Sequence, residues 1–179
     1  DSHIQNKKDS KIYIDKLPLN IVFVGEIVRI FPNAKFILSL RHPCDCVLSC
    51  FMQDFKLNNA MANFLSLEDS ANLYKNVMNL WSIHTSIFSI NYHQIKYENL
   101  ITNFETTVNQ VLKFLELPWD DSLFQYYNVA KERRLISTPS YGQVIKPIYS
   151  NAIGRWKRYK EETSKVYPML EPWIKKFNY

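Results

Sequence analysis

Glycine is scarce in this sequence, since it occurs only at Gly25, Gly142 and Gly154 among 179 residues. A loop that cradles a phosphate group with its backbone N–H groups ordinarily needs two or more clustered glycines. No segment supplies such a cluster. The sequence therefore predicts no glycine-rich phosphate loop.

Long hydrophobic runs are also absent. No stretch of about eighteen consecutive apolar residues occurs, so we predict no membrane-spanning helix. The first residues lack Met and a basic segment followed by an apolar one, so we predict no signal peptide. We expect a chain that begins partway through a domain and belongs to the cytoplasm.

The cysteines are few and clustered, at Cys44, Cys46 and Cys50. An odd, clustered set is a poor disulfide framework and suits a reducing compartment. Together with His42 they suggest zinc, but zinc sites usually combine two separated ligand clusters. Because the sequence has no second cluster, we expect no metal.

The charge balance is basic, with a net charge of +5 and a pI of about 9.0. This fits either a mildly basic protein without an anionic partner or one that attracts an anionic ligand. A nucleic-acid binder is the alternative from another class and would show a steep salt dependence. We expect no nucleic-acid partner, because the sequence has no long Lys/Arg run and no known reader motif.

The hydrophobic pattern predicts strands alternating with helices. The predicted strands cover residues 35–40 and 93–97. The predicted helices cover residues 19–31, 44–54, 67–90, 106–115, 151–159 and 168–177, of which the first is expected to be buried and to end at Pro32. A long irregular loop is predicted over residues 128–150. This order is typical of an α/β fold with a parallel sheet flanked by helices. We find no domain boundary, so residues 1–179 are expected to form one domain.

Polar residues follow both predicted strands. Arg41 comes after the first strand, and Tyr97 and Glu98 come at the end of the second. In open parallel sheets, ligands bind outside the carboxyl ends of the strands. Ser49 lies two turns into the helix after Arg41, and a guanidinium with a hydroxyl suits a phosphate. The structural alternative is an arginine that caps the sheet and a serine that packs within a helix.

Four segments then resemble one family in its own order. They are YIDKLPLN from Tyr13, FPNAKFILSLRHPCDCVLS from Phe31 to Ser49, KYENL from Lys96, and STPSYGQVIKPIYSNAIGRW from Ser137 to Trp156. The sequence resembles sulfotransferases that use 3′-phosphoadenosine 5′-phosphosulfate (PAPS), and is closest in these motifs to protein-tyrosine sulfotransferases and related bacterial enzymes. The resemblance covers roughly residues 12–160 and implies the three-layer, P-loop-like sulfotransferase fold.

The resemblance implies roles for individual residues. Arg41 and Ser49 would hold the 3′-phosphate, and Tyr97 would touch the adenosine. Lys16 and Ser140 would stabilise the transition state. The residues implied to bind the nucleotide are, in full, Arg41, Ser49, Tyr97, Ser140, Tyr149 and Arg155. Gln53 stands where the tyrosine sulfotransferases carry a second arginine, which implies one weaker phosphate contact.

The resemblance also implies parts that these residues do not supply. In the family, a loop near the N-terminus cradles the 5′-phosphosulfate, and a Glu or His general base follows it. We expect both to be missing here, because only fifteen residues precede Lys16 and because His84 and His93 are better explained as structural residues. The chain would then be a C-terminal portion of the domain and inactive alone.

The sequence thus predicts a sulfotransferase that uses PAPS and releases PAP (3′-phosphoadenosine 5′-phosphate), represented by the portion with the 3′-phosphate site. Three alternatives remain: an inactive PAP-binding or interaction module on the same fold, a nucleotide kinase or other phosphoryl transferase, and the nucleic-acid binder. The absence of a G-x-x-x-x-G-K-[ST] motif argues against the kinase. The expected partner is a small-molecule nucleotide, and a homo-oligomer is compatible with the sequence. The acceptor, whether peptide tyrosine, glycan or small molecule, cannot be deduced; Phe51, Phe55, Phe64 and Trp81 could line its pocket or belong to the core.

Overall fold

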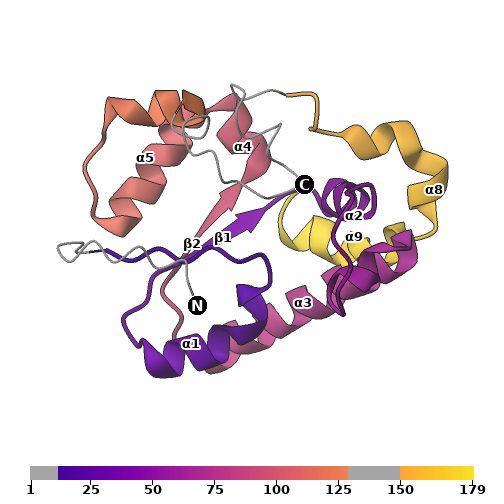
Figure 1. Cartoon of the computed structure of the whole chain (residues 1–179), viewed down its shortest axis with the longest axis horizontal. Helices are drawn as coiled ribbons and strands as arrows, with labels where there is room; N and C mark the ends of the chain where they lie inside the picture. The colour runs from indigo at the N-terminus through magenta and orange to yellow at the C-terminus, as the bar shows by residue number, and fades with distance from the viewer. Residues whose placement is uncertain (1–11, 129–149) are drawn as a thin grey trace.

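The computed structural model of the chain describes residues 12–128 and 150–179 (Figure 1). Its centre is a parallel pair of strands, β1 (Phe36–Leu40) and β2 (Tyr92–Lys96). The register pairs Phe36 with Tyr92 and Leu40 with Lys96. The prediction of two neighbouring parallel strands is therefore confirmed.

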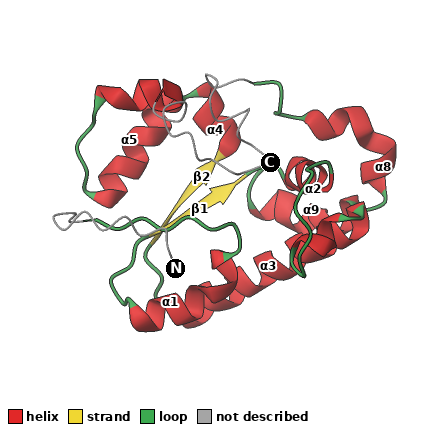
Figure 2. Ribbon diagram, in the orientation of Figure 1, coloured by secondary structure: helices red, strands yellow, loops and turns green. Residues whose placement is uncertain are grey.

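Helices surround this pair (Figure 2). The α-helices are α1 (Val24–Ile30), α2 (Pro43–Phe51), α3 (Leu67–Ile87), α4 (Tyr97–Thr102), α5 (Phe104–Leu115), α8 (Lys160–Ser164) and α9 (Tyr167–Lys176), and the 3₁₀ helices are η1 (Asn20–Phe23), η2 (Met61–Phe64), η3 (Asp121–Gln125) and η4 (Arg155–Tyr159). Among these helices, none combines the length and hydrophobicity that crossing a bilayer requires.

One face of the strand pair carries the main core. Leu38 and Leu40 alternate with exposed residues along β1, as expected for a half-buried strand. They form one buried cluster with Trp81 of α3 and Trp173 of α9. Trp81, one of the aromatic residues that could have lined an acceptor pocket, is thus a core residue.

The other face is covered only in part by the described residues. His93 stacks on Phe114 of α5 with ring centres 5.5 Å apart. Its register partner Ile37 remains 41% exposed. The fold among these residues is α/β with a small parallel sheet, and a three-layer sheet is not formed by them alone.

The predicted helix at 19–31 differs from its expectation. It is not buried all round, because Phe23, Ile30 and Phe31 are each more than half exposed. Only one side packs, where Gly25 lets α1 approach α3: a Cβ at this position would lie 2.8 Å from His84 Cε1. The prediction of a fully buried helix, which was based on its apolar composition, is therefore wrong for most sides of this segment.

The remaining elements agree with the predictions, with shifts at their ends. The long helix ends at Ile87 rather than at residue 90, and the helix after Pro43 ends at Phe51. The closing segment begins as the 3₁₀ helix η4 and continues as α8 and α9. The sequence did not predict α4, which starts directly after β2. The predicted loop at 128–150 lies almost entirely outside the described residues.

Candidate functional site

Two polar side chains leave the sheet side by side. Arg41 follows the last residue of β1, and Tyr97 follows the last residue of β2, which are paired in register. The Arg41 guanidinium carbon lies 5.0 Å from the centre of the Tyr97 ring, a cation–π contact. The parallel register therefore places both residues at one carboxyl end, where ligands bind in such sheets.

A pocket opens beside this pair. Its volume is about 320 Å³, and its walls are formed by Arg41, Ser49, Tyr97, Asn151, Ala152, Arg155, Arg158 and Tyr159. Four of the predicted nucleotide-binding residues, Arg41, Ser49, Tyr97 and Arg155, thus face one space although they come from different elements. Among the described residues, three arginines and no carboxylate line it, which favours an anionic ligand.

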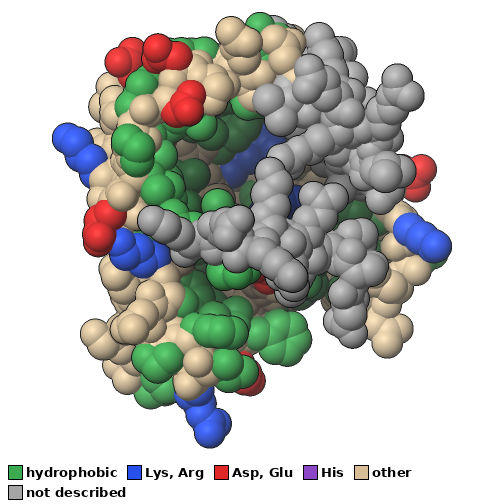
Figure 3. Space-filling view, turned by 60° about the vertical axis from the view of Figure 1, so that its left-hand side comes forward, with side chains coloured by type: hydrophobic (Ala, Val, Ile, Leu, Met, Phe, Trp, Pro, Cys, Tyr) green, Lys and Arg blue, Asp and Glu red, His purple; other side chains and the backbone are tan. Residues whose placement is uncertain are grey.

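Basic side chains also occupy a hollow in the surface. On the face shown in Figure 3, Lys and Arg side chains lie in the depth of a recess, and hydrophobic side chains form much of the wall around it. Charges held in a recess with low-dielectric walls attract anions more strongly than charges on an open surface.

The Arg41 guanidinium makes one hydrogen bond among the described residues, in addition to its contact with Tyr97. Its Nη2 donates a hydrogen bond of 2.6 Å to the carbonyl oxygen of Ala152. Its Nε–H is buried and has no hydrogen-bond partner among the described residues. A buried unpaired donor costs about 1–3 kcal/mol, so an acceptor atom beside Arg41 would improve the site.

Asp45 fixes the segment that carries the second arginine. It is 1% exposed, and its carboxylate accepts hydrogen bonds from the backbone N–H of Gly154 at 2.6 Å and of Trp156 at 2.8 Å. Gly154 has a positive φ of 66°, a conformation that glycine adopts without strain. This turn aims both N–H groups at one carboxylate and so anchors η4 to α2.

Glu98 organises the strand end. Its Oε1 accepts from the backbone N–H of His42 at 2.9 Å, and its Oε2 accepts from the Tyr179 hydroxyl at 3.1 Å. His42 Nδ1 in turn accepts from the N–H of Cys44 and caps α2. The His42 ring stacks on Trp156, with centres 5.0 Å apart. These contacts fix the two residues that flank Arg41 and Tyr97.

A model of the Sulfotransferase family matches residues 2–121, which is more than half of the chain. The chain belongs to the sulfotransferase family.

Individual relatives agree with this membership. The sulfotransferase-family chain is 31% identical over 167 residues to an uncharacterized protein of Aquifex aeolicus (strain VF5), a match that covers 91% of this chain and 21% of that protein. It is 23% identical to a protein-tyrosine sulfotransferase of Drosophila melanogaster, over 79% of this chain and 29% of that protein. It is also 23% identical to protein-tyrosine sulfotransferase 1 of Danio rerio, over 86% of this chain and 44% of that protein. The chain therefore spans less than half the length of these relatives.

Other predicted site residues of this sulfotransferase-family chain lie elsewhere. Lys16 is exposed and is not among the pocket residues, and neither is the half-buried Gln53. Ser140 and Tyr149 lie outside the described residues. The roles of all the predicted site residues stay predictions.

Four pocket residues were not predicted from the sequence. They are Asn151, Ala152, Arg158 and Tyr159. A signal was available for Arg158, because it follows Arg155 by three residues and a 3₁₀ helix places such residues on one side. It was missed because this segment was interpreted as an ordinary closing helix.

The interior histidines have packing roles in the structure. His84 stacks on Phe88, which follows the last residue of α3, and lies against Gly25, and His93 stacks on Phe114. Neither lines the arginine pocket. Among residues 12–128 and 150–179, His, Cys, Asp and Glu side chains form no group of three that could hold a metal ion.

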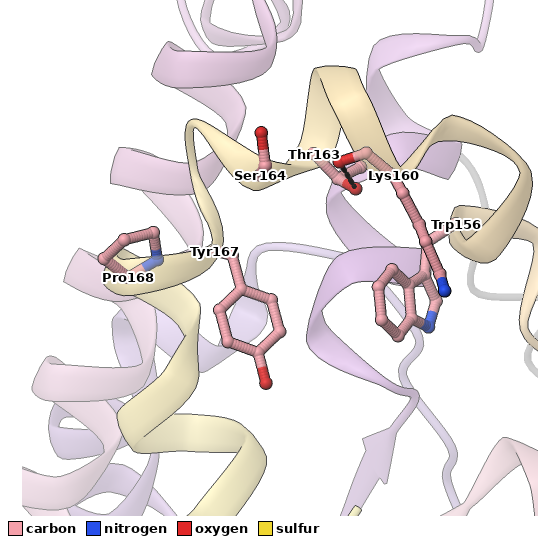
Figure 4. A pocket seen from close by; sticks show the side chains of 6 residues that line it. All are labelled: Trp156, Lys160, Thr163, Ser164, Tyr167 and Pro168. Atoms are coloured by element: carbon pink, nitrogen blue, oxygen red, sulfur yellow. Dashed lines mark hydrogen bonds between the residues drawn. The ribbon is translucent and has the colours of Figure 1, made fainter.

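A second hollow lies among residues that follow Arg155 in the sequence. Its volume is about 300 Å³, and it lies among Trp156, Lys160, Thr163, Ser164, Tyr167 and Pro168 (Figure 4). Trp156 and Tyr167 face each other across it, with ring centres 6.3 Å apart. Lys160 is the one charged residue in this set, so this hollow suits an anion less well than the pocket with three arginines.

The titration of His42 gives a first testable result. Burial lowers the pKa of His42 below its ordinary 6.5, assisted by Lys157 and Arg41 and opposed by the carboxylates of Asp45 and Glu98. The unfolded chain therefore takes up a proton more readily than the folded one, so the stability from neutral His42 is present above about pH 6.5 and is lost as the pH falls below it. Protonation at Nδ1 also removes the acceptor for Cys44 N–H.

We therefore expect the free energy of unfolding to fall between about pH 7 and pH 5, and to fall less steeply in a His42→Asn variant. Asparagine keeps a side-chain acceptor for the helix cap and does not titrate. Urea unfolding without nucleotide at several pH values measures both slopes. Equal slopes for the two proteins would show that His42 does not contribute.

Proposed function

We propose that these 179 residues form the 3′-phosphate-binding portion of a PAPS-dependent sulfotransferase, as part of a single domain with the three-layer sulfotransferase fold. The observation that carries the proposal is the pocket where Arg41, Ser49, Tyr97 and Arg155 meet. The family membership over residues 2–121 supports it.

The residues of the pocket suit the 3′-phosphate and adenosine of PAP. A phosphomonoester carries a charge of about −1.5 to −2 near pH 7. Guanidinium groups and a hydroxyl bind its oxygens through charge-assisted hydrogen bonds. Tyr97, which lies against Arg41, offers an aromatic face to the nucleoside part.

The reaction would transfer the sulfuryl group to an acceptor oxygen or nitrogen. The S–O bond to the 5′-phosphate breaks as the bond to the acceptor forms, and PAP leaves with the negative charge. Cations and hydroxyls fixed near the developing charge lower the barrier. Lys16 and Ser140 are the residues that we propose for this role, on the strength of their motifs. The proton of the acceptor needs a general base, and the described residues that line the pocket include no histidine or carboxylate.

The acceptor class that we favour is a tyrosine hydroxyl. Two of the relatives are protein-tyrosine sulfotransferases by name, and they cover 79% and 86% of this chain. Glycan and small-molecule hydroxyls or amines are the alternatives that the transfer assay below must include.

Calorimetry with PAP and with adenosine 5′-monophosphate tests the binding site. The second nucleotide differs by lacking the 3′-phosphate. We expect PAP to bind at least about 30-fold more tightly, because a charge-assisted contact with a phosphate contributes about 2 kcal/mol. Equal affinity for the two nucleotides would contradict the proposed site.

A transfer assay with radiolabelled PAPS tests the second half of the proposal. With tyrosine peptides, phenols and glycans as acceptors, we expect no turnover by these residues alone, because the sequence offers no clustered glycines to cradle the 5′-phosphosulfate. PAP binding without transfer would also fit the second candidate, an inactive PAP-binding module on the same fold. Clear turnover would mean that other residues of this chain hold the 5′ side, and the roles given above would be wrong.

A further inference from the structure

Arg158 lies in the arginine pocket although no sequence motif assigns it a role. It belongs to the 3₁₀ helix η4, which begins at Arg155. In a 3₁₀ helix the side chains of residues i and i+3 lie on the same side. Both arginines accordingly line the pocket, whereas Lys157, which lies between them in sequence, does not.

The contacts of Arg158 with the described residues leave most of its donors available. Its Nη2 lies 3.4 Å from the carbonyl oxygen of Asn151, a long and weak hydrogen bond. A guanidinium has five N–H donors. The residue is exposed, so its side chain can reach a ligand in the pocket without leaving a buried site.

The charges in the pocket are unbalanced. Arg41, Arg155 and Arg158 bring three positive charges, and the other wall residues that the structure describes are neutral. The ion pairs among the described residues are Lys35–Glu116 and Lys175–Glu171, so none of the three arginines has a carboxylate partner there. Three cations that face one space repel each other unless an anion lies between them. The arrangement suits a ligand group with more than one negative charge.

We infer that Arg158 is a third cation for the 3′-phosphate and that it makes the pocket selective for nucleotides that carry a phosphate at the 3′ position. The inference rests on the proposed function, because it names a further residue of the same site. Arg41 approaches from the end of β1, and Arg155 and Arg158 approach together from η4. A phosphate held from two sides in this way loses affinity with each cation that is removed.

The experiment compares Arg158→Gln with Lys157→Gln by calorimetry, using PAP and adenosine 5′-monophosphate at one ionic strength. Both variants lose one positive charge from neighbouring positions of η4, but only Arg158 lines the pocket. We expect Arg158→Gln to weaken PAP binding about 10-fold or more and to change the affinity for adenosine 5′-monophosphate less than about 2-fold. Lys157→Gln should change both affinities less than about 3-fold.

An Arg158→Lys variant separates charge from shape. Lysine keeps the charge but lacks the planar fork of donors, so we expect PAP affinity between those of the wild type and Arg158→Gln. Circular dichroism and urea unfolding verify that each variant is folded. If Arg158→Gln is not folded, the PAP affinity of Arg158→Lys is compared with that of the wild type instead.

Three outcomes overturn the inference. If Arg158→Gln binds PAP as Lys157→Gln does, Arg158 does not contact the phosphate, while the proposed function stands. The same conclusion follows if Arg158→Gln lowers the affinity for both nucleotides by the same factor. If the wild-type protein itself binds PAP and adenosine 5′-monophosphate with equal affinity, the proposed function is wrong, and the inference about Arg158 is wrong as well.

Discussion

Replacement of Arg41 with alanine is expected to weaken PAP binding by about 100-fold or more. Arg41 is the half-buried cation at the carboxyl end of β1, and its guanidinium faces the pocket that we assign to the 3′-phosphate. Truncation of one partner of a hydrogen-bonded, desolvated charge pair costs about 2–5 kcal/mol, and each 1.4 kcal/mol is about a tenfold change in affinity. Calorimetry with PAP measures the effect directly.

Arg41 also has a structural contact that must be separated from binding. Its Nη2 donates to Ala152 O, so the alanine variant loses this link between β1 and the segment before η4. Arg41→Lys keeps the positive charge but lacks the planar guanidinium with its forked donors, so it should recover only part of the affinity for PAP. Arg29→Ala, on the exposed side of α1, is the matched control and should bind PAP as the wild type does. PAP affinity within about threefold of wild type in Arg41→Ala would contradict the assignment.

The strand pair and one side of the pocket followed from the sequence. Two short apolar runs, each followed by polar residues, are local signals, and the rule that ligands bind at the carboxyl ends of parallel strands does not depend on details of packing. Arg41, Ser49 and Tyr97 could therefore be predicted together. The structure places them around one pocket, as it does Arg155.

The other side of the pocket depends on long-range contacts that no local pattern reveals. Asp45 is more than a hundred residues before Gly154, and its hydrogen bonds are to backbone N–H groups, which every residue except proline has. Asp45 lies near the start of the helix predicted over residues 44–54, and no role was predicted for it from the sequence. The spacing of Arg158 from Arg155 is a local signal, but whether both face Arg41 depends on how η4 is anchored.

The degree of burial was the least reliable sequence inference. The segment from Leu19 to Phe31 is apolar on nearly every side, yet one side of it packs against α3 and the rest is exposed among the described residues. Composition reports which residues can be buried, but the number of neighbouring elements decides how many of them are.

Substitution of Asp45 is expected to have the largest effect on stability. The carboxylate is 1% exposed and accepts two short hydrogen bonds from backbone N–H groups. Asp45→Asn is nearly isosteric, but its amide has one acceptor oxygen and turns an NH₂ group toward a donor. A buried donor left without a partner costs about 1–3 kcal/mol, and bonds to a charged group are at the upper end of that range. We expect the free energy of unfolding to fall by about 3 kcal/mol, as measured by urea unfolding.

The same substitution should weaken nucleotide binding indirectly. Asp45 contacts no pocket residue through its side chain but holds Gly154 and Trp156, which flank Arg155. Release of this segment would let Arg155 and Arg158 move away from Arg41, so PAP affinity should fall in a protein that is still folded at low urea. Asp54→Asn, at an exposed position beyond the end of α2, is the control and should change stability by less than about 0.5 kcal/mol. If Asp45→Asn unfolds at the same urea concentration as the wild type, the two hydrogen bonds do not anchor η4, and the account of how the pocket is assembled is wrong.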